Sequence, residues 1–262
     1  MSGVRFDEPA AGVGRITLDR PERRNALSFG LVAELHDLLD EVAGSEPLRA
    51  VVLAAEGPSF CAGLDLADWG EPPDVGAHRQ MTVGRNGQSF LSSVVAHVHR
   101  LPQIVVAAVQ GAAFGGGLSL ACAADVRVVA PDARLCAAFI RTGLSGTDFG
   151  ISYLLPRIVG AGRALDLIAS GREVDGVEAE RIGLASQVAD DPGAAALGYA
   201  AGVAAFPRTG LVLTKEAFWH NVEAPSLEAA MAMEDRNQLL ASAAPDVQAF
   251  MAAYRERITR RS

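Results

Sequence analysis

The sequence has little of the features that mark several specialised classes of protein. Its 262 residues contain 3 cysteines, and Cys61, Cys122 and Cys136 show neither CxxC spacing nor a neighbouring histidine cluster. A disulfide framework and a metal site are therefore not expected. The 23 basic residues are outnumbered by 31 acidic ones, which gives a formal net charge of -8. Nucleic acid is an unfavourable main partner for such a chain, because a phosphate backbone selects basic surfaces.

The chain also lacks a recognisable targeting or membrane signal. Residues 1–9 contain neither the apolar segment of a signal peptide nor a basic amphipathic transit pattern, so we expect a cytoplasmic protein. Residues 104–124 are nearly free of charge and long enough to span a bilayer. Gln110, the glycines at 115–117 and the β-branched opening fit a buried parallel strand better. No membrane span is expected.

Hydrophobic residues are plentiful, at 50% of the chain, and are sufficient for one large α/β core. Apolar runs predict strands and longer amphipathic stretches predict helices, in a βαβ rhythm. The expected strands cover 13–18, 50–54, 104–109, 126–130 and 185–188. The expected helices cover 28–44, 77–100, a short stretch after 115, 151–160, 163–170, 177–182, 193–220, 225–242 and 245–258. We expect an α/β core over residues 1–195 and a C-terminal helical region over 196–262.

Two of the expected strands end in glycine-rich turns. Residues 111–120 read GAAFGGGLSL and follow the run 104–109, and residues 60–66 read FCAGLDL and follow the run 50–54. Each pattern predicts a strand that breaks at glycine and leads into a helix, with backbone N–H groups left free at the break. Two such breaks side by side would direct two donors at one oxygen. That arrangement stabilises an enolate or a tetrahedral oxyanion.

Four segments together resemble one known family. They are RPERRNAL at 20–27, FCAGLDL at 60–66, the glycines at 115–117 and LPRIVG at 155–160. Their order and spacing are similar to those of the crotonase (enoyl-CoA hydratase/isomerase) superfamily over nearly the whole chain. The resemblance implies a crotonase-like spiral of ββα units with a C-terminal helical trimerisation region, assembled as a homotrimer or a dimer of trimers. It also implies an acyl-CoA thioester as the substrate and no permanently bound cofactor.

The resemblance assigns roles to particular residues. The backbone N–H groups of Leu64 and Gly116 correspond to the oxyanion-hole donors of the family. The residues that correspond to its substrate-binding positions are Arg24, Ala26, Ala62, Asp65, Leu66, Phe114, Ser119 and Phe139. We also expect Asp65 to cap a short helix that follows it, and the loop over 68–85 to border the acyl group.

The same comparison shows which residues of the family are replaced. Hydratases of the family use two glutamates to position water and move protons, and these correspond to Ser119 and Phe139 here, so the two-glutamate route to hydration is not supported. Asp148 is the remaining acid. It aligns with an aspartate that dienoyl-CoA isomerases use for proton transfer and that chlorobenzoyl-CoA dehalogenases use as a nucleophile. The residues alone also allow Asp148 to be the N-cap of a helix that starts at Phe149.

Three functions stay open at this point. The first, and the expectation, is an enzyme of the enoyl-CoA hydratase/isomerase family, a lyase or isomerase that works through a thioester enolate with Asp148 as acid and base. The second is an acyl-CoA-binding protein without catalysis. The third is hydrolysis or dehalogenation with Asp148 as the nucleophile.

Overall fold

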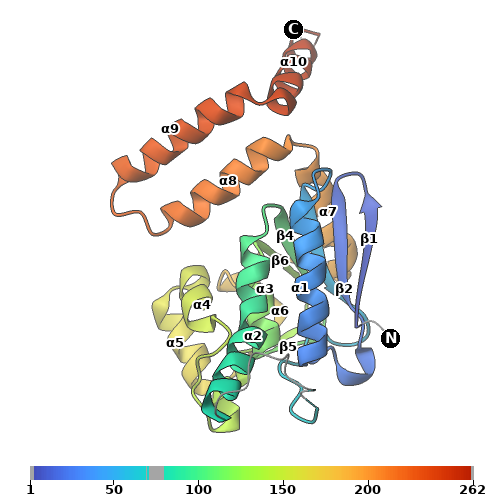
Figure 1. Ribbon diagram of the computed structural model, residues 1–262, viewed down its shortest axis with the longest axis vertical. Coiled ribbons are helices and arrows are strands. Elements are labelled where there is room, and N and C mark those ends of the chain that lie inside the picture. The colour runs from blue at the N-terminus through green and yellow to red at the C-terminus, as the bar shows by residue number, and fades with distance from the viewer. Residues whose placement is uncertain (1–2, 69, 71–79, 261–262) are drawn as a thin grey trace.

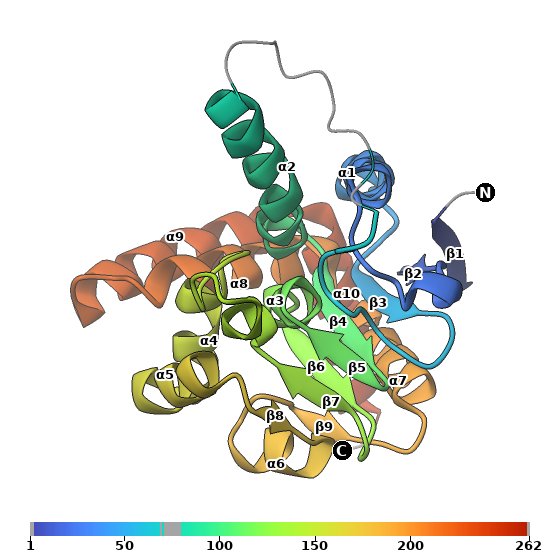
Figure 2. The ribbon, with the colours of Figure 1, turned by 90° about the horizontal axis from the view of Figure 1, so that it is seen from below.

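The chain folds around two β-sheets (Figures 1 and 2). The structure is a computed structural model and describes residues 3–68, 70 and 80–260. Within these residues the larger sheet has the strand order β1-β2-β3-β4-β6-β9. Its strands are β1 (Val4–Ala10), β2 (Val13–Leu18), β3 (Ala50–Ala55), β4 (Ile104–Val109), β6 (Val126–Val129) and β9 (Gln187–Val188). The strands β1 and β2 form an antiparallel hairpin, and every later pair in this sheet is parallel.

The smaller sheet begins immediately beyond the end of β4. It contains β5 (Ala112–Phe114), β7 (Arg134–Cys136) and β8 (Glu173–Val174). The chain passes from one sheet to the other at Gly111, which has a φ of 55°. A Cβ at this glycine would lie 1.9 Å from the Pro58 carbonyl oxygen, so only glycine fits this crossing.

The helices pack on both faces of the larger sheet. In Figure 2, α1 (Phe29–Gly44), α2 (Gln80–Arg100) and α3 (Gly116–Ala123) lie over one face, and α7 (Pro192–Ala204) lies over the other. The remaining helices are α4 (Ile151–Val159), α5 (Ala161–Ser170), α6 (Gly176–Arg181), α8 (Arg208–Asn221), α9 (Leu227–Ala243) and α10 (Pro245–Thr259), with short 3-10 turns η1 (Pro21–Arg23) and η2 (Ala138–Thr142). As predicted, Ser28 caps α1, and its side chain accepts a hydrogen bond from the Leu31 N–H.

Alternate residues of the central strands enter two separate hydrophobic clusters. On β3, Val51 and Leu53 belong to the large cluster under α1 to α3, whereas Val52 belongs to the small cluster that Ala196 and Ala200 of α7 complete. Because a parallel strand buried on both faces needs apolar side chains throughout, these strands appear in the sequence as unbroken apolar runs. The two glycine-rich breaks follow the ends of β3 and β4.

The C-terminal helices α8, α9 and α10 extend away from the sheets (Figure 1). The boundary that we predict between residues 195 and 196 falls inside α7, a helix that packs on the sheet. Within the described residues, no single helix is both long and apolar enough to cross a bilayer. The helices α7 and α8 meet that test only as a pair, across a bend of 108°.

Most of the predicted elements are confirmed, with two kinds of exception. The prediction of one helix over 193–220 is wrong, because the chain breaks between Ala204 and Arg208, where Pro207 has no N–H for a continuing helix. Four strands were not predicted: β1, β5, β7 and β8. The segment 104–124, considered above as a span, forms β4, β5 and α3 in turn.

Candidate active site

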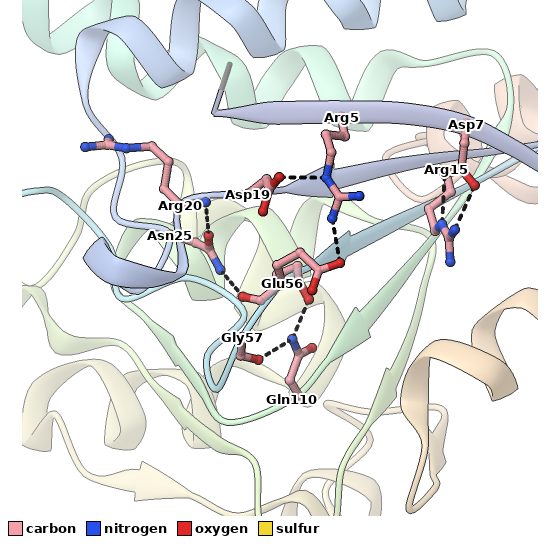
Figure 3. A network of polar contacts seen from close by, with 10 residues as sticks. Arg5, Asp7, Arg15, Asp19, Arg20, Asn25, Glu56, Gly57 and Gln110 are labelled. Atoms are coloured by element: carbon pink, nitrogen blue, oxygen red, sulfur yellow. Dashed lines mark hydrogen bonds and ion pairs between the residues drawn. The ribbon is translucent and has the colours of Figure 1, made fainter. Parts of the chain in front are cut away.

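Two side-chain amides hold the turn that follows β3 (Figure 3). The Asn25 Nδ2 group donates to the carbonyl oxygens of Glu56 at 2.9 Å and Ser59 at 2.8 Å. From the other side, Gln110 Nε2 donates to the Gly57 carbonyl oxygen at 3.2 Å. Asn25 is fully buried and has a φ of 54°, a left-handed conformation that asparagine tolerates better than most residues. The turn is thus tied both to the segment before α1 and to the end of β4.

The two glycine breaks lie side by side, joined by backbone hydrogen bonds. The Cys61 N–H donates to the Ala112 carbonyl at 3.0 Å, and the Phe114 N–H donates to the Cys61 carbonyl at 3.0 Å. A Cβ at Gly63 would lie 2.7 Å from the Phe114 carbonyl oxygen and 3.6 Å from the amide nitrogen of Gly116. Gly63 therefore has to be glycine for the breaks to approach this closely.

Leu64 and Gly116 both line one cavity. The Leu27 N–H donates to the Gly63 carbonyl and the Asp65 N–H donates to the Leu27 carbonyl. Neither of these two hydrogen bonds uses the Leu64 N–H. Gly116 is the first residue of α3, where N–H groups have no acceptor within the helix. No described residue accepts a hydrogen bond from either amide. Both N–H groups thus belong to residues of the cavity wall and are left unpaired by the described residues.

The cavity has a volume of about 210 Å³. Its walls come from the two breaks, from the segment 138–144, from Asp148 and Phe149, and from Gln88 of α2. The aromatic rings of Phe139 and Phe149 stack with centroids 6.3 Å apart. Leu66 and Leu144, which are 68% and 73% exposed, form an apolar rim. The lining is therefore largely apolar, with few polar groups.

Asp148 is held by two donors and is not a helix cap. The helix α4 starts at Ile151 with Gly150 as its N-cap residue, so the alternative prediction of a capping role is wrong, because the helix begins later than expected. The Phe149 N–H donates to Asp148 Oδ1 at 2.7 Å. Gln88 Nε2 donates to Oδ1 at 2.7 Å and to Oδ2 at 2.9 Å. The half-buried carboxylate faces the cavity with a defined orientation.

Some of the predicted substrate-binding residues line the cavity and the others lie outside its lining. Ala62, Leu66 and Phe139 line the cavity together with the predicted catalytic residues. Phe114 lies outside the lining, with the guanidinium groups of Arg134 and Arg141 over its ring at 5.4 Å and 6.0 Å.

Three others also lie outside the lining. Ser119 is fully buried in α3, and within the described residues its hydroxyl has no hydrogen-bond partner. Ala26 is buried. Arg24 is exposed, and its carbonyl accepts the Ala62 N–H at 3.0 Å.

Asp65 supports the first break from behind. Its carboxylate accepts hydrogen bonds from Arg23, at 3.1 Å from Nε and 2.5 Å from Nη2, and from the Asp68 N–H at 3.1 Å. Burial raises the pKa of Asp65, but these hydrogen bonds outweigh that effect and the pKa is lowered. The expectation that Asp65 caps a helix is wrong, because residues 66–68 and 70 form no helix. The predicted acyl loop over 68–85 lies largely outside the described residues.

Gln88 and Phe149 are among the cavity residues that sequence reasoning missed. Gln88 lies three residues before Leu91 and seven before Val95, so it shares their helix face. Leu91 and Val95 are buried, and a polar residue that continues their apolar stripe is the signal that could have identified Gln88.

The chain is similar to known proteins over nearly its whole length. The family model for enoyl-CoA hydratase/isomerase matches residues 8–261. A probable enoyl-CoA hydratase of Mycobacterium tuberculosis is 40% identical over 241 residues, 91% of this chain and 85% of the relative. The 1,2-epoxyphenylacetyl-CoA isomerase of Escherichia coli is 34% identical over 250 residues, 93% of this chain and 92% of the relative. The crystal structure of a probable enoyl-CoA hydratase/isomerase from Mycobacterium abscessus has a TM-score of 0.89 at 37% identity and covers 98% of this chain and 97% of that one.

Proposed function

Because the chain belongs to the enoyl-CoA hydratase/isomerase family, the crotonases, we propose that it is an isomerase that shifts a double bond within an acyl-CoA thioester. The observation that carries this proposal is the position of Asp148. Among the described residues that line the cavity, Asp148 is the one with a carboxylate. The positions of the two glutamates that hydratases of the family use are occupied by Ser119 and Phe139. The similarity to an enzyme named as a CoA-thioester isomerase is consistent with the proposal.

The amides of Leu64 and Gly116 hold the thioester oxygen. A thioester loses a Cα proton readily only if the negative charge that develops on its oxygen is stabilised, and each preorganised donor contributes about 3 kcal/mol. The close contact between the two glycine breaks sets the separation of these donors before the substrate arrives. The apolar walls exclude water, which strengthens the electrostatic interaction.

One carboxylate is sufficient for a proton shift. Asp148 takes the Cα proton of a β,γ-unsaturated thioester, and the electron pair moves to the carbonyl oxygen to give a dienolate. The protonated Asp148 then returns the same proton to Cγ, and the double bond ends between Cα and Cβ. No atom is gained or lost, and the carboxylate is regenerated. Hydration needs in addition a group that positions and activates water, and Ser119 and Phe139 supply no carboxylate for it.

The surroundings of the site extend the proposal. The coenzyme A part of the substrate contributes to binding and is not changed in the reaction. We place its nucleotide and pantetheine along Arg24, Ala26 and the 62–66 segment, where a guanidinium offers a partner for phosphate.

We also propose a cytoplasmic homotrimer or dimer of trimers. Exposed apolar side chains on the C-terminal helices support it, among them Leu239 and Met251.

The test is turnover of matched thioesters by the wild type and by Asp148→Asn. The wild type should convert a β,γ-enoyl-CoA into its α,β-isomer without a change of mass. Asp148→Asn should lose a factor of about 10² to 10⁴ in kcat and keep its affinity for the thioester. Unchanged turnover of Asp148→Asn would refute the proposal.

Other outcomes identify the remaining alternatives. A product heavier by one water indicates hydration, and thioester binding without turnover across the panel indicates a non-catalytic protein. A covalent adduct on Asp148 in the intact-protein mass spectrum indicates a nucleophilic route.

A further inference from the structure

Gln88 approaches Asp148 from an element remote in sequence. It is an exposed residue on α2, 60 positions before the aspartate, and its Nε2 lies within 2.9 Å of both carboxylate oxygens. The buried residues Leu91 and Val95 anchor the same face of α2 in the core. The amide is therefore presented to the carboxylate by a packed helix, which fixes its position better than a loop would.

The two oxygens of Asp148 are not equivalent. Oδ1 accepts hydrogen bonds from the Phe149 N–H at 2.7 Å and from Gln88 at 2.7 Å, whereas Oδ2 has only the longer bond from Gln88 at 2.9 Å among the described residues. The oxygen with more donors is the poorer proton acceptor. Oδ2 is consequently the atom on which a transferred proton is least opposed by existing hydrogen bonds.

We infer that Gln88 is a positioning residue for Asp148, which orients the carboxylate and assigns the transferred proton to Oδ2. This inference rests on the proposed isomerase function. The glutamine amide suits both halves of a proton shuttle, because its NH₂ group donates to the ionised carboxylate and its carbonyl can accept from the protonated one. A lysine at this position would favour only the ionised form, and a glutamate would oppose it.

The test compares Gln88→Leu and Gln88→Glu with the wild type in the pH dependence of kcat/KM. Gln88→Leu removes a donor that stabilises the ionised carboxylate, so the acidic limb of the profile should move to higher pH. Gln88→Glu places a second carboxylate against the first, and the shift should be larger. Thioester affinity and the melting temperature should change little in both. Ser89→Ala, an exposed neighbour on the same helix, is the control and should match the wild type.

The outcomes for Asp148→Asn and for the Gln88 variants distinguish a failure of the positioning role from a failure of the proposed isomerase function. Loss of turnover in Asp148→Asn together with wild-type pH profiles in both Gln88 variants overturns the positioning role and leaves the isomerase proposal standing. A uniform loss of rate at all pH values, with no displaced limb, also overturns it, because that is the effect of a merely structural residue. Full turnover in Asp148→Asn removes the proposed function itself.

Discussion

Gly117 packs against the backbone of Cys61 so closely that a Cβ built on the glycine would lie 2.2 Å from the Cys61 carbonyl oxygen. This contact joins the second glycine break to the first. The same carbonyl accepts the Phe114 N–H, so main-chain contacts join the two breaks directly. The relative position of the two breaks therefore depends on close backbone contacts that leave no room for a Cβ at Gly63 or Gly117.

Gly117→Ala should damage activity and stability together. The added methyl group has to displace the Cys61 carbonyl, and overpacking of this kind costs about 1–3 kcal/mol. Because the displacement separates the two amides, kcat should fall by more than the loss of folded protein explains. Urea denaturation and steady-state kinetics on the folded fraction measure the two effects.

Gly162→Ala is the matched control for this substitution. Gly162 lies in α5, and nothing lies within 4 Å of the Cβ that alanine would add. Removing a glycine from a helix should stabilise the protein by about 0.5–1 kcal/mol. Activity should not change. If Gly117→Ala is as active and stable as Gly162→Ala, the contact with Cys61 does not set the geometry of the breaks.

Asn25→Gly should loosen the turn before the first break without introducing backbone strain. Glycine accepts the φ of 54° but cannot replace the donors to Glu56 and Ser59 or the acceptor for the Arg20 N–H. Loss of these buried hydrogen bonds should cost about 1–3 kcal/mol. Asn25→Ala should cost about 1 kcal/mol more, because alanine opposes the left-handed conformation. Equal stability of the two variants would contradict the assignment of strain to this position.

The sequence was most informative where burial leaves a periodic pattern. The runs at 13–18 and 104–109 are strands with the predicted bounds. The run 104–109 is apolar throughout, as a strand buried on both faces requires, whereas in 13–18 the polar residues Arg15 and Thr17 alternate with buried apolar ones. The strand β1 was not predicted, because it is an edge strand whose residues are mostly exposed and include charged ones such as Arg5 and Asp7. The strands β5, β7 and β8 are two or three residues long, too short to show any period.

The site could be predicted only where a short stretch of sequence determines the local structure. The glycines that bring Leu64 and Gly116 together are visible in the sequence, because close backbone approach demands glycine. The partner of Asp148 was not visible, because Gln88 reaches it across 60 residues. Asp65 shows the opposite error: an aspartate after a glycine turn suggests a cap, but its tertiary partner Arg23 determines its position.

Lys215→Met should weaken the attachment of α8 to the core. The Lys215 ammonium is buried, lies 2.7 Å from Asp125 Oδ2 and donates to the Gln103 carbonyl at 2.9 Å. Burial lowers the pKa of Lys215, and the nearby Asp125 offsets part of this effect. Removing the cation leaves a largely buried carboxylate with neutral donors, the Val105 N–H and Trp219 Nε1. The free energy of unfolding should fall by about 3–5 kcal/mol.

The double variant Asp125→Asn/Lys215→Met checks the cause of that loss. If an unpaired buried charge is responsible, neutralising Asp125 as well should recover part of the stability, so the two single losses should not add. Fluorescence of Trp219, which bonds to Asp125, reports whether α8 has detached. Strict additivity would show that packing, not charge, anchors this helix.

The contact between α1 and α2 should make stability depend on pH through His36. The Nδ1 atoms of His36 and His97 are 2.8 Å apart, and the His97 Nε2 lies 3.3 Å from Asp40 Oδ1. Burial and the neighbouring His97 lower the pKa of His36, while Asp40 and Asp37 partly oppose this. As the pH falls, His36 is therefore protonated at a higher pH in the unfolded chain than in the folded chain. The stability contributed by neutral His36 is complete above its unfolded pKa of about 6.5 and is lost as the pH falls from there toward the folded value.

Urea denaturation at pH 7.5, 6.5 and 5.5 measures this effect in the wild type and in His36→Asn. The wild type should lose stability toward pH 5.5, and His36→Asn should lose distinctly less over the same range, because its side chain does not titrate. His220→Asn, which replaces an exposed histidine on α8, should keep the wild-type dependence. His99 is half-buried, and burial also lowers its pKa. It therefore leaves some pH dependence in every variant, so the comparison rests on the difference between His36→Asn and His220→Asn. Identical slopes in those two variants would mean that protonation of His36 does not strain the junction between α1 and α2.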